Sequence, residues 1–204
     1  MMADRVILHS DINCCYASIE HLHHPELAGK PLAVGGDPEA RHGIVLTADY
    51  TAKKYGVKTG MALWQAKQVC PNITFVSPRM DLYLRFSRME HEIYAEYTDM
   101  QEPYGIDECW LDVTGSSSLK GDGLLIAQEI SRRMKSELGI TVSVGVSLSI
   151  RYLQSLVLII RSLMQLQLCI RVSLSRRHGH FRWQIFYTLA KVRTESLHYL
   201  VSKL

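Results

Sequence analysis

The chain has 204 residues, 47% of them hydrophobic, which is enough apolar material for a buried core in one domain or a domain and a half. Its five cysteines are odd in number and show no C-x-x-C spacing, so we expect reduced thiols in a cytoplasmic protein rather than disulfides or a zinc site. The net charge of +3 conceals a division, because residues 1–147 contain 14 basic and 19 acidic residues, whereas residues 148–204 contain nine basic residues and one acid. The two parts are therefore interpreted separately.

Secretion and membrane insertion are not expected. The N-terminus has no positively charged segment followed by an apolar run, as a signal peptide would have. The one candidate for a membrane span, residues 152–170, carries Arg161 in its middle among several Gln and Ser residues, and a charge at that depth is costly. We therefore predict a protein without a membrane partner.

Hydrophobic periodicity predicts an alternation of strands and helices over residues 5–147. The predicted strands are residues 5–9, 43–47, 73–76 and 140–147, with an acidic hairpin at residues 104–114. The predicted helices are residues 13–23 capped by Asn13, 50–55 capped by Asp49, 61–70, 81–100 and 124–138. Without residues 14–79 the order is strand, helix, strand, strand, helix, strand, which is a split βαβ unit of ferredoxin type. The prediction is an α+β fold, a ferredoxin-like βαββαβ sheet with a small, mostly helical insertion.

The hairpin sequence YGIDECWLDVT, residues 104–114, places three carboxylates in a predicted strand. Strand alternation sends one set of side chains to a core and the other set away from it: Cys109, Leu111 and Val113, against Glu108, Trp110 and Asp112. Asp107 directly precedes Glu108, so these two carboxylates converge only if the chain turns beside them, and Pro103 and Gly105 permit that turn. Taken alone, this stretch is better explained as a hairpin with solvated acids, because a metal site needs a third acid from elsewhere.

Asp11, at the end of the first predicted strand, supplies that acid. In a sheet of this type the first and third strands are central neighbours, so Asp11 approaches Asp107 and Glu108. Three carboxylates repel one another unless cations neutralise them, and oxygen ligands suit Mg²⁺. Two such ions can activate a hydroxyl and hold both ends of an in-line phosphoryl transfer. A helix N-terminal charge or a turn residue remains the alternative for Asp11.

Four segments carry a family resemblance: HSDINCCYASIE at residues 9–20, GGDP at 35–38, LTADYTAKKYGV at 46–57 and IDECWLDVT at 106–114. In this order they resemble the Y-family translesion DNA polymerases, and in particular the DNA polymerase IV (DinB/UmuC) type of Gram-positive bacteria. The resemblance covers residues 5–147. It implies that residues 1–14 and 80–147 form the palm, the UmuC-type catalytic domain, and that residues 15–79 form the fingers.

The resemblance implies an error-prone DNA-directed DNA polymerase of translesion synthesis and DNA repair, acting on primer–template DNA and dNTPs. It assigns two Mg²⁺ ions to four groups: the carboxylates of Asp11, Asp107 and Glu108 and the carbonyl of Ile12. Asn13 and Gly105 stand where many relatives have Asp and Ser. Both lie beside the predicted ligands rather than among them, so we do not interpret them as inactivating.

Nucleotide contacts are also implied by the resemblance. Tyr16 matches the aromatic residue that lies under the incoming sugar and excludes a 2′-hydroxyl, although by sequence alone a core aromatic is the alternative. Tyr50 and Lys53 match residues that hold the triphosphate, and a donor and a cation one helical turn apart suit phosphates. A solvated lysine is the alternative for Lys53. Arg41 and Lys54 are further phosphate or template contacts.

The resemblance ends after Ser147, where the family continues with Asn-Lys, Ala-Lys and Lys-Pro motifs. Codons chosen for a family-like continuation, FNKIFAKLGSDYKKPD, give SIRYLQSLVLIIRSL when they are read one base later, which is residues 149–163. The same shift turns LPVADLLYVG into FRWQIFYTL, residues 181–189. We therefore interpret residues 148–204 as an out-of-frame tail, irregular or helical, in place of the palm end, thumb and little finger. The clamp-binding peptide of the intact family, and with it the sliding clamp, is not expected here.

Two other functions stay open at this point. One is a catalytically silent fragment or pseudogene product with at most weak DNA binding. The other is a different two-metal phosphoryl-transfer enzyme, such as a cyclase or a nuclease, because the arrangement of acids alone does not fix the reaction. The combination of Tyr16, Tyr50 and Lys53 favours the polymerase.

Overall fold

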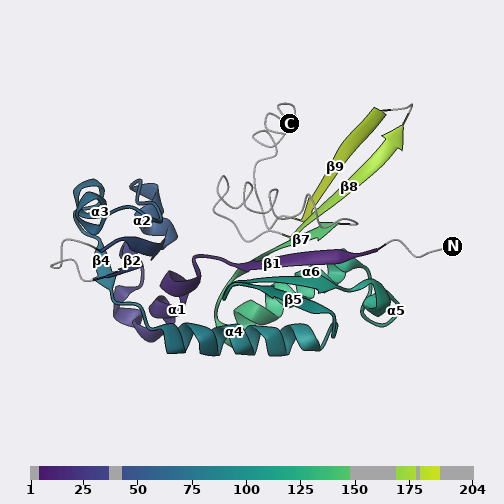
Figure 1. Cartoon of the computed structure of the whole chain (residues 1–204), viewed down its shortest axis with the longest axis horizontal. Coiled ribbons are helices and arrows are strands. Elements are labelled where there is room, and N and C mark those ends of the chain that lie inside the picture. Colours follow the sequence, from purple (N-terminus) through teal and green to yellow (C-terminus); the bar gives the residue numbers. More distant parts are fainter. Residues whose placement is uncertain (1–4, 37–42, 148–168, 178–179, 189–204) are drawn as a thin grey trace.

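The computed structural model describes residues 5–36, 43–147, 169–177 and 180–188, which form two sheets and the helices around them (Figure 1). The larger sheet has six strands in the order β5-β6-β1-β7-β8-β9. Its strands are β1 (Ile7–Ile12), β5 (Gln101–Tyr104), β6 (Glu108–Asp112), β7 (Val142–Ser147), β8 (Cys169–Arg177) and β9 (His180–Thr188). The helices are α1 (Cys15–His23), α2 (Tyr50–Lys54), α3 (Leu63–Val69), α4 (Met80–Ala95), α5 (Ser117–Lys120) and α6 (Gly123–Arg133), with short 3₁₀ turns at Pro25–Leu27 and Thr114–Ser116.

The large sheet has β1 at its centre, antiparallel to both β6 and β7. One face is apolar and packs with α4 and α6 into the main core. Strand alternation is the cause, because Cys109, Leu111 and Val113 are fully buried in that core while Glu108, Trp110 and Asp112 are only partly buried. The predicted βαββαβ order of an α+β fold, β1-α4-β5-β6-α6-β7, is confirmed.

Helix α4 ends earlier than predicted, whereas the helical segment that begins with α6 ends where predicted but changes its type. Helix α4 ends at Ala95 rather than at residue 100, since Thr98 turns inward and donates from Oγ1 to the Asp112 carbonyl at 2.7 Å. Helix α6 ends at Arg133 and continues as a π-helical turn, Met134–Leu138. The predicted stop at Gly139 is confirmed, because its φ of +73° is left-handed and a Cβ there would lie 2.8 Å from Leu22 Cδ2.

The insertion after β1 contains a three-stranded sheet in the order β3-β2-β4, with β2 (Leu32–Gly35), β3 (Val45–Ala48) and β4 (Thr74–Val76). It lies at the opposite end of the molecule from α5, together with α2 and α3 (Figure 1). Strand β2 was not predicted. Asp49 caps α2 as predicted, since its Oδ1 accepts from Ala52 N at 2.7 Å, and it also accepts from Leu32 N at 3.2 Å. That second bond joins α2 to β2.

The predicted cap of α1 is wrong. Cys14, with a left-handed φ of 48°, is the N-cap residue, and no side chain caps this helix end. The Asn13 amide is instead directed to the neighbouring strand. It accepts from Ser143 Oγ at 2.8 Å and donates to Thr141 Oγ1 at 3.2 Å. A long-range contact with β7 and the residue before it therefore displaces the local cap.

The prediction of an irregular or helical tail is also wrong for residues 169–177 and 180–188. Strand β8 runs parallel to β7, and β9 pairs antiparallel with β8, so that the hairpin extends the large sheet and projects away from α4 (Figure 1). Ile170, Val172 and Leu174 alternate with polar residues, a period-two pattern typical of a strand. Residues 148–168, and with them most of the candidate membrane segment, lie outside the described part. None of the described helices is long and apolar enough to cross a membrane.

Candidate active site

The backbone brings the three predicted metal-binding acids together. Asp11 on β1 lies directly opposite Glu108 on β6 in the strand register. Side chains at such a position have Cβ atoms about 4.5–5.5 Å apart. Asp107 immediately precedes β6, and its carbonyl accepts a hydrogen bond from Ile12 N at 2.8 Å. Segments far apart in the sequence thus meet at one point beside the centre of the sheet.

The predicted turn before β6 is present. Gly105 has a left-handed φ of +74°, a conformation that glycine adopts without the steric cost that a side chain adds. Pro103 lies on β5, the edge strand, where its missing N–H costs no ladder hydrogen bond on the open side. The turn reverses the chain within three residues, so Asp107 and Glu108 are both placed beside the end of β1.

One face of β1 and β6 carries Asp11 and Glu108 and is called the site face. The two carboxylates of β6 on this face, Glu108 and Asp112, have different partners. Glu108 Oε2 lies 3.0 Å from His9 Nε2, and the His9 ring stacks on Trp110 with ring centroids 4.2 Å apart. Asp112 binds Arg5 at 2.9 Å and also accepts from Thr114. Burial opposes ionisation of Asp112, but the hydrogen bonds from Thr114 and Arg5 hold its pKa below the ordinary value. The Asp112 carboxylate is thus already bound by Arg5 and Thr114, and it is not one of the three predicted metal ligands.

Magnesium suits this site by the chemistry of its donors, because carboxylates and a backbone carbonyl are hard oxygen ligands. The Asp11 carboxyl is 1% exposed and thus shielded from bulk water. Within residues 5–36, 43–147, 169–177 and 180–188, however, no three His, Cys, Asp or Glu side chains are already gathered closely enough to hold a metal ion. The backbone thus places the predicted ligands on neighbouring strands, whereas the Glu108 side chain is directed toward His9.

Tyr16 projects from the first turn of α1 and is only half-buried. Its ring stacks on Tyr83 of α4 with centroids 4.3 Å apart and planes 9° from parallel. Burial, followed by the neighbouring Cys15 and Asp107, raises the pKa of the Tyr16 hydroxyl. The effect of Asp107 on this pKa indicates that the partly exposed Tyr16 ring lies near the acidic site.

A buried ionic group fixes the lower ring of this stack. Glu20 is fully buried, and it accepts from Tyr83 Oη at 2.6 Å and from Arg79 at 2.6 and 3.1 Å. Burial raises the pKa of Tyr83, and the hydrogen bond to Glu20 raises it further. Since Glu20 is one helical turn from Tyr16 on α1, a single group anchors both helices beneath the stack.

The predicted triphosphate contacts lie on α2, close to the end of β1. Lys53 Nζ donates to Cys14 Sγ at 3.2 Å and lies 5.5 Å from the centroid of the Tyr50 ring. Tyr50 and Lys53 therefore stand together, and the bond to Cys14 places them beside the chain that follows Asp11. Arg41 lies outside the described residues. Lys54 is exposed at the end of α2.

The sequence analysis missed two residues close to the acids. His9 shares the parity of Asp11 on β1, so strand periodicity alone could have placed it on the site face. Glu90 of α4 is fully buried, and it accepts a hydrogen bond from Tyr94 Oη. Burial raises the pKa of Glu90 well above its ordinary value, and the charges of Asp107 and Asp11 raise it further. The spacing of α4 could have identified Glu90, because it lies four residues after Phe86 and three before Ile93, on the buried face of the helix.

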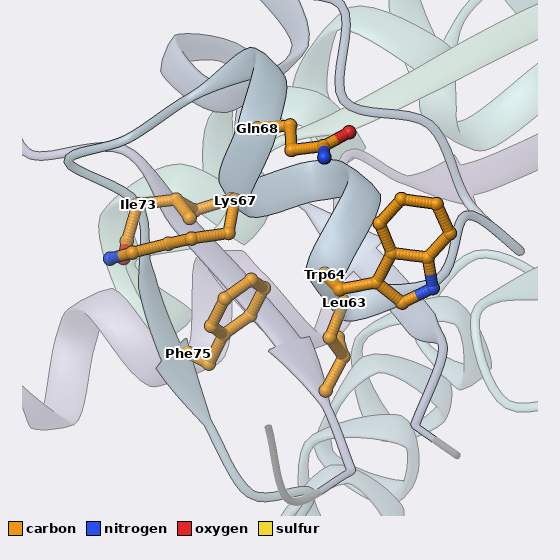
Figure 2. Close-up of a pocket in the computed structure, with 6 residues that line it drawn as sticks. All are labelled: Leu63, Trp64, Lys67, Gln68, Ile73 and Phe75. Atoms are coloured by element: carbon orange, nitrogen blue, oxygen red, sulfur yellow. The ribbon is translucent and has the colours of Figure 1, made fainter. Parts of the chain in front are cut away.

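A separate groove lies between α3 and β4 (Figure 2). It is lined by Leu63, Trp64, Lys67, Gln68, Ile73 and Phe75. Lys67 Nζ donates to the Ile73 carbonyl at 3.3 Å, and Trp64 is exposed. None of the predicted site residues lines this groove, so it is distinct from the acidic site.

Comparison with known proteins identifies the family. The model of the impB/mucB/samB family matches residues 10–151, more than half of the chain. The chain belongs to this family. DNA polymerase IV of Acetivibrio thermocellus is 57% identical over 143 residues, which cover 70% of this chain and 36% of that protein. The predicted resemblance to the DinB/UmuC type is thus confirmed.

Solved structures agree with this assignment. A Y-family DNA polymerase chimera matches with a TM-score of 0.65 and 33% identity, covering 70% of this chain and 42% of the other. An insertion ternary complex of Dbh DNA polymerase matches with a TM-score of 0.63 and 33% identity, covering 69% and 42%. The chain of this impB/mucB/samB family member spans less than half the length of these relatives.

Proposed function

We propose that this chain is the catalytic part of a Y-family translesion DNA polymerase, which transfers a nucleotide from a dNTP to a primer 3′-hydroxyl. The observation that carries the proposal is the pairing of Asp11 with Glu108 across β1 and β6, with Asp107 hydrogen-bonded beside them. This backbone arrangement supports a site formed by the three carboxylates, on a fold shared with DNA polymerases. Error-prone synthesis past damaged bases is the family activity we assign to it.

Asp11, Asp107, Glu108 and the Ile12 carbonyl would hold two Mg²⁺ ions. When bound, such ions lower the pKa of the primer hydroxyl and neutralise charge on the triphosphate. The chain's own groups orient the nucleotide. The Tyr16 ring, fixed by its stack on Tyr83, would meet the sugar and exclude a 2′-hydroxyl. Tyr50 and Lys53 would bind the phosphates as donor and cation.

The domain division that we propose follows the two sheets. Residues 1–14 and 80–147 would form the palm, and residues 15–79 the fingers. Support comes from a separate hydrophobic cluster within the insertion, formed by residues between Ala33 and Ile73. The main cluster under the large sheet also takes in Cys15, Ala17, Ile19, Leu32 and Val34, so α1 and β2 pack against the proposed palm. Primer–template DNA and a dNTP are the proposed partners. Cys14, Cys15, Cys70 and Cys109 are free thiols, which suits a cytoplasmic enzyme.

We also propose that the reading frame changes near residue 148. The family match ends at residue 151, which supports a loss of resemblance at that point. Sequencing the coding DNA from Val146 onward tests this directly. The Asn-Lys and Lys-Pro motifs in the other register would support a frame change. A downstream register without family motifs would refute it.

Primer extension by the 204-residue chain tests the polymerase function, with Mg²⁺ or Mn²⁺ and all four dNTPs. We expect primer extension by the wild type. Asp107→Asn and Glu108→Gln should each reduce it by at least about a hundredfold, since each variant removes a negative charge that would neutralise the metal ions. Asp112→Asn is the matched control, because Asp112 lies on the same strand face but binds Arg5. Equal extension by all variants would refute the proposed site. Salt-sensitive DNA binding without any incorporation would instead favour the silent fragment.

A further inference from the structure

His9 is the buried neighbour of the acidic site. It lies on β1 two residues before Asp11, so both side chains occupy the same face of the strand. In the register His9 is opposite Trp110, and Glu108 is its diagonal neighbour on β6. His9 is 0% exposed, and its Nε2 is 3.0 Å from Glu108 Oε2. A contact of this length is a hydrogen bond.

The direction of this hydrogen bond follows from the chemistry of its two partners. An ionised carboxylate is only an acceptor, so the proton between the two atoms belongs to His9 Nε2. The bond occupies Oε2 of Glu108 and leaves Oε1 as the oxygen for another ligand. A carboxylate that is already held at one oxygen also loses less side-chain conformational entropy when its other oxygen binds a cation.

The imidazole is itself held in place by Trp110. The two rings stack with centroids 4.2 Å apart and planes 31° from parallel. Such aromatic pairs add to the stabilisation that comes from the area they bury. The contact with Trp110 of β6 therefore holds the His9 ring in one orientation, with Nε2–H directed at Glu108 Oε2.

Asp112 shows by contrast what His9 contributes. It lies on the same face of β6, but its partner is the guanidinium of Arg5 at 2.9 Å. A guanidinium carries a permanent positive charge, which would oppose cations at the same carboxylate. An imidazole N–H donor orients a carboxylate without that permanent charge. The partner of Glu108 is thus the kind that a metal-binding carboxylate requires.

We propose that His9 is a positioning residue for Glu108: it holds Oε2 and directs the remaining oxygen to the metal ions. This inference rests on the metal site of the proposed function. Hydrogen-bond partners of metal ligands typically change metal affinity or activity by about 10–100-fold when they are replaced. His9 touches neither nucleotide nor metal in this proposal, and it acts only through Glu108.

Mn²⁺ binding to the full 204-residue chain tests the proposal without requiring polymerase activity. Free Mn²⁺ is followed by electron paramagnetic resonance for the wild type and a set of variants. His9→Phe keeps a ring beside Trp110 but has no donor, whereas His9→Gln keeps an N–H donor but has no ring. Glu108→Gln and the double variant complete a thermodynamic cycle. His23→Gln, at an exposed histidine of α1, is the control.

We expect His9→Phe to weaken Mn²⁺ binding by about tenfold or more, His9→Gln and His23→Gln to stay near the wild type, and His9→Phe to add nothing once Glu108 is replaced. A folded His9→Phe variant with wild-type affinity would overturn the inference. So would an equal loss in the Glu108→Gln background, which would show a purely structural effect. If His9→Phe does not fold by circular dichroism, His9→Leu takes its place. If Glu108→Gln itself binds Mn²⁺ like the wild type, the proposed metal site fails, and the role of His9 fails with it.

Discussion

Replacing Glu90 by glutamine is expected to change how the stability of this protein depends on pH. Glu90 is fully buried under the site face, and no Lys or Arg pairs with it among the described residues. Burial raises its pKa well above the ordinary value; the hydrogen bond from Tyr94 opposes this shift, and the charges of Asp107 and Asp11 add to it. The glutamine side chain would keep a carbonyl oxygen to accept that hydrogen bond, so the change removes the ionisable proton while preserving the contact.

The sign and size follow from proton linkage. Because the pKa of Glu90 is raised in the folded state, the folded protein keeps a proton that the unfolded chain loses near its ordinary pKa of 4.5. The stabilisation is fully present below that value and is lost as the pH rises toward the folded pKa. One proton corresponds to a fall of about 1.4 kcal/mol in the free energy of unfolding for each pH unit. Glu90→Gln has no such proton, so its free energy of unfolding should lack this contribution to the pH dependence.

Urea unfolding of the wild type and of Glu90→Gln between pH 5 and pH 8 measures the difference. Burial lowers the pKa of His91, which has the opposite effect on the slope, but this contribution is common to both proteins. Glu92→Gln is the control, since Glu92 is exposed on the same helix. Parallel pH profiles for the wild type and Glu90→Gln would refute the reasoning.

Substitutions at three further residues test the packing and the nucleotide site. Gly123→Ala should lower the free energy of unfolding by about 1–3 kcal/mol in urea, because its Cβ would lie 2.4 Å from Val6 Cγ1; unchanged stability would contradict this packing. Arg79→Ala, by the same measurement, should cost about 2–3 kcal/mol, since it leaves the buried Glu20 carboxylate without its cation. Arg79→Lys should restore only part of that loss. Tyr16→Ala should raise incorporation of ribonucleotides relative to deoxynucleotides by at least about tenfold in single-turnover extension; unchanged discrimination would exclude the role assigned to the ring.

Local chemistry accounts for the predictions that the structure confirms. The alternation along β6 put Cys109 and Leu111 in the core, Asp49 capped α2, and Gly105 allowed the turn. Each of these depends on residues within a few positions of one another. The Asn13 cap failed for the opposite reason, because its amide bonds to Ser143 and Thr141, residues distant in sequence.

Two strand assignments show the limits of periodicity. Strand β2 is only four residues long, and so short an apolar run lacks enough repeats to reveal a period. The alternation in β8 is present in the sequence and favours a strand, although the loss of family resemblance predicts an irregular or helical tail. A chain segment that alternates can extend an open sheet edge whatever its origin, because main-chain hydrogen bonds make the pairing.

The sequence by itself determined the family and the order of the elements, and it predicted which acids form the site, because motifs, periodicity and turn residues are local properties. Only the tertiary structure decided what those acids contact. The β1–β6 register set Asp11 opposite Glu108, gave Glu108 to His9 and Asp112 to Arg5, and left Glu90 buried beneath them. Hydrogen bonds, burial and charge act between atoms that folding brings within a few ångströms, and the distance along the chain does not contain that information.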